Sequence, residues 1–185
     1  MKKFIAVFTL FVCFVNCVHA YNQGDVNRLL ETKSCPNGDL SRANLVGVDL
    51  IGANLSGADL LAAYLHRSDL TGARLVGTNF TQAHLDEAKL LGTDLTGANF
   101  SDAHLSNANF TGANLTRVDF AGADLSGSDL TGANLLSAKF NNTIMPNGEE
   151  YSGQGQDYKA SLPSSPLSQD TVSYTHLTLP TKRIV

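Results

Sequence analysis

The stretch "DFAGADLSGSDLTGANLLSAKF" (residues 119–140) carries a Leu or Phe at every fifth position, at Phe120, Leu125, Leu130, Leu135 and Phe140. An α-helix repeats its apolar face every 3.6 residues and a strand every two, so neither element explains this period. The spacing instead predicts a short repeated unit that presents one large apolar group and then changes direction.

The same rhythm extends over most of the chain. From residue 40 to residue 140, all 21 positions divisible by five are Leu or Phe, and Gly stands two places later in 11 of the 21 units. One place before the centre the residue is Asn or Asp in 15 of 21 units, and two places before it is Ala in 14 of the 20 units between 43 and 138. The unit is A-(N/D)-L-x-G, in which Gly tolerates the positive φ of a turn. A short side followed by a turn, repeated, predicts a coil.

The Phe residues indicate how many sides the coil has. Phe80, Phe100, Phe120 and Phe140 are twenty residues apart, whereas Phe110 lies elsewhere. Aromatic rings stack in one column if twenty residues make one turn, which predicts a coil with four sides. A random scatter of Phe among permissive sites is the alternative.

Residues 38–142 resemble the pentapeptide repeat protein family over 21 consecutive units. The resemblance implies an all-β fold, a right-handed quadrilateral β-helix (a solenoid) of about five coils. The segment before the repeats resembles that of exported members, which often carry a second Cys shortly after the first. Gly38 stands about there in this chain, so Cys35 is expected to be a buried or idle thiol without a redox partner.

Residues 1–20 have the order of a secretory signal peptide, with Lys2 and Lys3 before the apolar run 4–15 and small Ala20 at the end. An uncleaved anchor and a lipid site at Cys17 are the alternatives. Cleavage after Ala20 would place the mature chain in the periplasm or outside the cell, with no membrane span.

The remaining segments flank the repeats. Residues 21–37 are predicted to form a helical N-terminal cap, with Asp25 capping a short helix and Val26, Leu29 and Leu30 on one face. Residues 143–171 are predicted to close the last coil and then form a disordered tail, since the composition from residue 149 is rich in Ser, Gly, Gln and Pro. Residues 172–185 resemble the conceptual translation of a transposase sequencing adapter, and we exclude them from fold reasoning.

Charge and motifs narrow the possible functions. The formal net charge is −4, which argues against binding of nucleic acid or anionic membrane through basic charge. The sequence contains no phosphate loop, zinc-ligand spacing, nucleophile elbow or dinucleotide motif, so we expect no enzyme activity, no cofactor and no metal ligands.

The sequence favours an exported structural or protein-interaction module with an unknown protein or cell-surface partner. The alternative, implied by the resemblance, is an inhibitor or protector of a topoisomerase that imitates DNA. Residues 38–142 hold eleven acidic and six basic residues, which is weak for that role, and export would separate the chain from a cytosolic target.

One wall of the predicted coil departs from the Asn, Asp and Gly of the consensus. On the wall centred on residues 45, 65, 85, 105 and 125, residues twenty apart share an outward column, so Arg67 and Glu87 are expected to pair and His84 and His104 to converge. Three interpretations stay open: neutral drift on a solvated wall, a metal site that lacks a third fixed ligand, and a protein-binding patch. The candidate interaction surface consists of Tyr64, His66, Arg67, His84, Asp86, Glu87 and His104.

Overall fold

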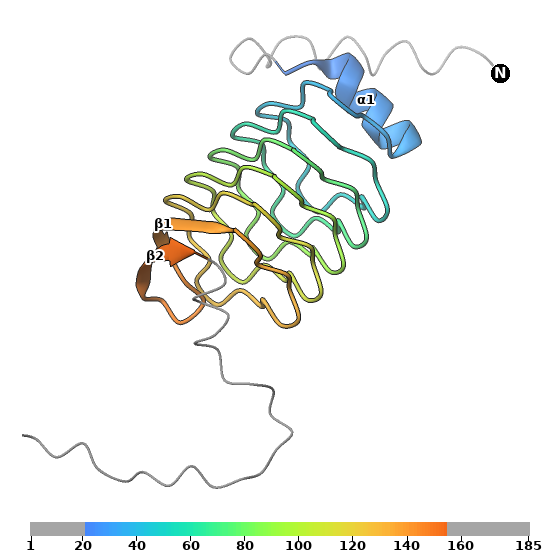
Figure 1. Ribbon diagram of the computed structural model, residues 1–185. Coiled ribbons are helices and arrows are strands. Elements are labelled where there is room, and N and C mark those ends of the chain that lie inside the picture. Colours follow the sequence, from blue (N-terminus) through green and yellow to red (C-terminus); the bar gives the residue numbers. More distant parts are fainter. Residues whose placement is uncertain (1–20, 155–185) are drawn as a thin grey trace, which may run out of the picture.

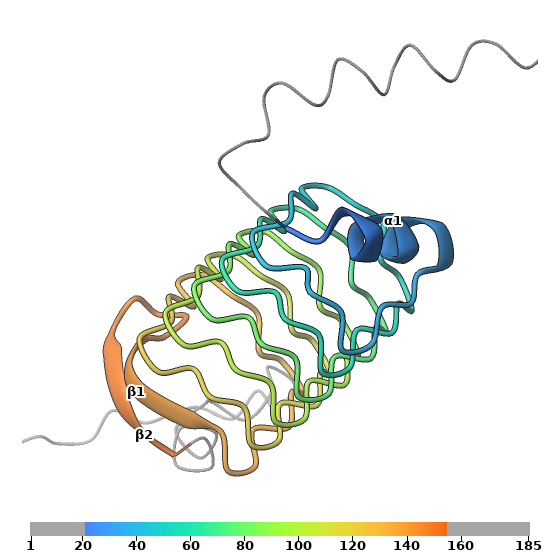
Figure 2. The same cartoon turned by 90° about the horizontal axis from the view of Figure 1, so that it is seen from above.

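The computed structural model describes residues 21–154 as a stack of coils with a helix at one end and a hairpin at the other (Figure 1, and from above in Figure 2). The elements are helix α1 (Gln23–Thr32) and strands β1 (Lys139–Ile144) and β2 (Glu150–Gln154). None of the helices in this range has the length and apolarity that crossing a membrane requires. The predicted signal peptide, the tail beyond residue 154 and the adapter-like segment lie outside the described residues.

Parallel β-bridges join residues that lie one coil apart. They run from Ser34↔Asn54 to Asp124↔Ile144, and each joins a residue to the one twenty positions later. The backbone N–H of Leu40, for example, donates to the carbonyl of Asp59 at 2.8 Å. One turn of the coil therefore takes four five-residue units, and residues twenty apart are neighbours at the spacing of about 4.8 Å between paired strands.

Each unit ends in a tight turn that the consensus residues explain. The carbonyl of Leu50 accepts from the N–H of Ala53 at 3.0 Å, and Gly52 between them has φ +68°, as position i+2 of a type II turn requires. Where Asn or Asp precedes the centre, its side chain fixes the turn from outside: Asn99 Oδ1 accepts from the N–H of Ser101 at 2.9 Å and from its hydroxyl at 2.6 Å. The polar consensus position is thus a turn-forming position.

The interior holds the large and small apolar residues of every unit. All Leu and Phe centres from residue 40 to residue 140 are buried. The rings of Phe80, Phe100, Phe120 and Phe140 stack with successive centroid distances of 4.6, 5.4 and 5.4 Å. Phe110 approaches Phe100 edge-on at 6.1 Å. The predicted Phe column is confirmed.

The coil starts earlier than the predicted residue 38. Ser34 already bridges to Asn54, and Cys35 is fully buried in the centre slot that Leu55 occupies one coil later. Cys35 is also a free thiol, as expected. The Leu or Phe pattern missed this first unit because a small apolar Cys fills its centre.

The coil also ends later than the predicted residue 142. Thr143 and Met145 are buried in the small and large slots of a further unit. The disorder predicted from residue 149 is wrong for Glu150–Gln154, because this segment pairs antiparallel with β1. Tyr151 packs against the core, with its ring edge-on to Phe140 at 6.1 Å. The prediction relied on the polar composition of this segment. It did not consider that the single ring of Tyr151 could pack at the end of the Phe column.

Helix α1 lies at the other end of the coil (Figure 1), and its cap differs from the prediction. Asn22 rather than Asp25 is the N-cap, since its side chain accepts from the N–H of Gly24 at 3.0 Å. Asp25 instead accepts from the backbone N–H of Asp39 at 2.8 Å, which ties the helix to the first coil. Val26 and Leu29 are buried as predicted, whereas Leu30 is 51% exposed, so the apolar face is narrower than the spacing suggested.

Candidate functional site

Three rings stack on the outside of one wall. The bridges Tyr64↔His84 and His84↔His104 place these residues in one outward column. The rings of Tyr64 and His84 lie 5.1 Å apart with 2° between their planes, and those of His84 and His104 lie 4.6 Å apart with 10°. The coil thus converts a twenty-residue spacing into one continuous flat surface, which we call the ring stack (Tyr64, His84 and His104).

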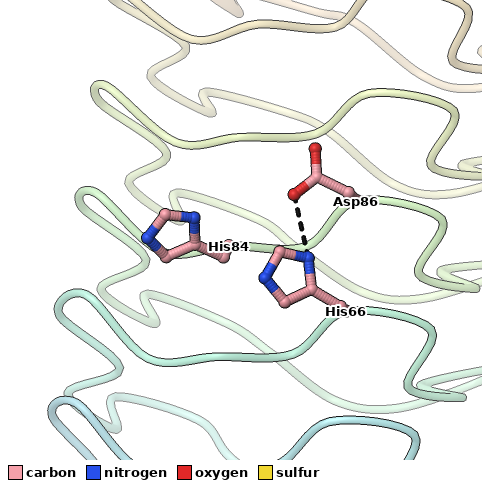
Figure 3. A group of neighbouring side chains, drawn as sticks. All are labelled: His66, His84 and Asp86. Carbon is pink, nitrogen blue, oxygen red and sulfur yellow. Dashed lines mark ion pairs between the residues drawn. The ribbon is translucent and has the colours of Figure 1, made fainter.

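An imidazole and a carboxylate occupy the neighbouring column. His66 Nδ1 and Asp86 Oδ2 are 3.0 Å apart, across two successive coils. The ring of His66 also lies 5.4 Å from that of His84. Figure 3 shows the His66 ring beside both His84 and Asp86, which come from the next coil. The sequence placed His66 and Asp86 in one column, but the approach of His66 to His84 depends on ring orientations that the repeat pattern does not determine.

An ion pair borders the imidazole cluster in the next column. Arg67 Nε donates to Glu87 Oε2 at 2.8 Å, and Arg67 Nη2 donates to Glu87 Oε1 at 3.1 Å. These bonds lower the pKa of the Glu87 carboxyl below its ordinary value. The expected pairing is therefore present. Both side chains are largely exposed, so the pair contributes little to stability and mainly fixes the shape of the surface.

The cluster is partly sheltered from solvent. Tyr64 is 38% exposed, and the side chains of His66 and Asp86 are 36% and 29% exposed. Partial burial, followed by the neighbouring His104 and His66, lowers the pKa of His84 below its ordinary value. His84 is therefore neutral at neutral pH, and one of its ring nitrogens keeps a lone pair that can accept a hydrogen bond or bind a metal ion.

The structure adds an apolar neighbour that the sequence reasoning missed. Val46 lies one coil before His66 in the same column and is 50% exposed. The sequence did contain a signal for it, because Val46 is β-branched and apolar, whereas the same column holds Ser at positions 106 and 126. Val46 extends the candidate surface with apolar area.

Within residues 21–154, one group of side chains has the composition and spacing of a metal site. His66, His84 and Asp86 each offer one ligand atom, and these atoms lie within 4.8 Å of one another. From the sequence, a metal site on this wall stayed one of three open interpretations and lacked a third fixed ligand. The expected convergence was between His84 and His104 within one column, whereas the group His66, His84 and Asp86 combines two columns.

One family model matches the repeat region of the chain. The family model described as "Pentapeptide repeat region" matches residues 43–115 and 63–140, which together span residues 43–140 of the 185. A search of curated proteins finds no match.

Several solved structures resemble the chain. The pentapeptide repeat protein Rfr23 from the cyanobacterium Cyanothece 51142 is 30% identical, with 66% of this chain and 98% of that one covered and a TM-score of 0.42. A pentapeptide repeat protein from the Arabidopsis thaliana thylakoid lumen is 24% identical, with coverage of 77% and 95% and a TM-score of 0.45. QnrB1, a plasmid-mediated fluoroquinolone resistance protein, is 22% identical, with coverage of 65% and 68% and a TM-score of 0.42.

Proposed function

This chain belongs to the pentapeptide-repeat family, and from that premise we propose that it is an exported, non-enzymatic solenoid that binds another protein through the ring stack and its neighbours. The proposal includes a right-handed quadrilateral β-helix of about five coils. The bridges between residues twenty apart and the turn in every unit support that geometry.

The ring stack is the observation that carries the proposal. Protein interfaces are enriched in Tyr and Arg, which combine a large contact area with hydrogen bonding. Here Tyr64, His84 and His104 form one flat surface, and the paired Arg67 and Glu87 border it. Because each ring stacks on its neighbour at 4.6–5.1 Å, its side chain is already restricted and loses less entropy on binding than a free side chain would.

Export is supported by the sequence of residues 1–20, which has the basic start, apolar run and small-residue end of a signal peptide. The partner is then a protein of the periplasm or the cell surface.

The distribution of charge favours this function over imitation of DNA. A rod that imitates a duplex needs continuous rows of negative charge. Here basic side chains interrupt the carboxylates: Lys33 contacts Asp49 at 3.0 Å, and Lys89 contacts Asp69 at 3.1 Å.

The test replaces the ring stack without disturbing the repeat. The triple variant Tyr64→Asn, His84→Asn and His104→Asn introduces a residue that already fills this slot in seven of the 21 units, so the variant should fold like the wild type. We expect the wild-type chain to recover a defined protein from the exported fraction and the triple variant to lose it.

A matched control changes another wall by the same type of substitution. Arg74→Asn with Asp94→Asn alters the slot before Leu75 and Leu95 and should leave recovery unchanged. Equal recovery of every protein by the wild type and the triple variant would rule out the ring stack as the binding surface.

A further inference from the structure

Two imidazoles and one carboxylate converge where the ring stack meets the neighbouring column. The ligand atoms of His66, His84 and Asp86 lie within 4.8 Å of one another, and His66 Nδ1 is 3.0 Å from Asp86 Oδ2. Ligands of a tetrahedral metal ion with bonds of about 2.0–2.1 Å lie about 3.3 Å apart. The His66–Asp86 pair is already near that spacing, and the ligand atom of His84 lies within 4.8 Å of both.

The cluster also has the chemistry of a particular class of metal. Imidazole suits late first-row metal ions such as Zn²⁺ and Cu²⁺, and a single carboxylate is common beside two imidazoles at zinc sites. The neighbouring carboxylate of Glu87 is engaged by Arg67 through two hydrogen bonds. Asp86 is therefore the carboxylate that faces the two imidazoles.

The framework holds the three residues on rigid backbone. His84 is bridged on both sides, to Tyr64 and to His104, and its ring stacks between theirs. Asp86 lies two residues after His84 on the same coil, and His66 lies one coil earlier. Precise sites require ligands on regular, supported backbone, which this wall provides.

We propose that His66, His84 and Asp86 bind one Zn²⁺ ion on the outside of the coil. Both imidazoles ligate as neutral groups, and Asp86 ligates through one carboxylate oxygen. His66 ligates through Nδ1 and keeps its ring proton on Nε2, so that the metal ion binds both His66 Nδ1 and Asp86 Oδ2. All three residues are partly exposed, so the fourth coordination position faces solvent.

This site shares His84 with the proposed protein-binding surface but does not depend on a protein partner. Zinc binding is measured on the purified chain alone, and partner recovery can be repeated in the presence of EDTA. If the chain does not bind Zn²⁺, the proposed protein-binding function still stands. If no protein partner is recovered, the proposed zinc site still stands.

The experiment is isothermal titration of the purified full chain, after treatment with EDTA and dialysis, with Zn²⁺. We expect one ion per chain at the cluster, and Co²⁺ as a substitute should give the visible absorption of a tetrahedral site. Three single variants use residues that the repeat already accepts in these slots: His84→Asn, His66→Ser and Asp86→Ser. Each should weaken binding by more than about tenfold.

Two further variants define the ligand set. The double variant Arg67→Gln with Glu87→Gln removes the neighbouring ion pair and should leave affinity unchanged. His104→Asn should weaken binding less than His84→Asn does, because His104 supports the ring of His84 without ligating. Absence of Zn²⁺ binding, wild-type affinity in His66→Ser, or a loss in His104→Asn equal to that in His84→Asn would overturn the proposed site.

Discussion

The ring of Phe100 lies parallel to the ring of Phe80, with 4.6 Å between their centroids and 2° between their planes. Phe120 stacks on the opposite side of Phe100 at 5.4 Å. A twenty-residue spacing in the sequence has thus become a column of rings along the interior. The same pairing rule that stacks these rings inside stacks Tyr64, His84 and His104 outside.

Replacing Phe100 by Ala should lower the free energy of unfolding by about 3–5 kcal/mol, because the substitution opens a cavity between two buried rings. Phe100→Leu is the control and should cost less, since Leu fills this slot in most units. Urea denaturation measures both variants. A loss below about 1 kcal/mol for Phe100→Ala would be inconsistent with a buried ring column.

Ser128→Ala should stabilise the protein by about 1 kcal/mol, because the buried hydroxyl of Ser128 has no hydrogen-bond partner among residues 21–154 and Ala is the common residue in this slot. Ser68 occupies the same slot on another coil, and its hydroxyl donates to the carbonyl of Leu65 at 2.8 Å. Ser68→Ala should therefore gain less stability or lose some. Equal effects of the two substitutions in thermal denaturation would contradict this difference.

Strand β2 should stabilise the end of the coil. Truncation after residue 148 removes β2 and with it the edge-on contact between Tyr151 and Phe140. We expect a lower melting temperature than for a truncation after residue 154, which retains β2. The same midpoint for both truncated chains, measured by circular dichroism, would show that the hairpin contributes nothing.

Asp129 should make stability depend on pH. Hydrogen bonds from the side chain and the backbone N–H of Thr131 hold the pKa of the Asp129 carboxyl below its ordinary value. A lowered pKa in the folded state means that the unfolded chain binds the proton more readily. The stabilisation is therefore complete above the ordinary pKa of about 3.9 and is lost as the pH falls through the folded-state pKa.

The variant Asp129→Asn keeps an oxygen acceptor in the turn and removes the titrating group. Its melting temperature should be below that of the wild type at neutral pH, and the two should converge in acid. A difference that stays constant from neutral pH into acid would mean that the carboxylate is not the cause.

The periodic part of the fold was predictable because each five-residue unit contains its own core residues and its own turn residues. The Phe spacing predicted the ring column, and the same spacing predicted the pairing of Arg67 with Glu87. The ends were less predictable, because end units depart from the consensus. Cys35 and Met145 fill centre slots without being Leu or Phe, and the N-cap of the helix is Asn22 where the sequence predicted Asp25.

The candidate site was predictable in position but not in detail. Columns follow from the twenty-residue coil, so the members of the ring stack could be grouped from the sequence. The approach of His66 to His84 joins two columns and depends on side-chain orientation. The twenty-residue spacing predicts where the backbone of each residue lies. The packing of neighbouring rings determines which ligand atoms come close together.

The most direct test of the account changes which residues are neighbours on successive coils, while it keeps every side chain of the wall that carries the ring stack. Insertion of one unit, "ANLSG", between Gly77 and Thr78 moves His84 and His104 to a different column from Tyr64 while the four stacked Phe residues shift together. The coil should still fold, as its circular dichroism will show. We expect the insertion variant to lose the protein that the wild type recovers from the exported fraction. Unchanged recovery by a folded insertion variant would contradict the claim that the twenty-residue coil assembles the binding surface.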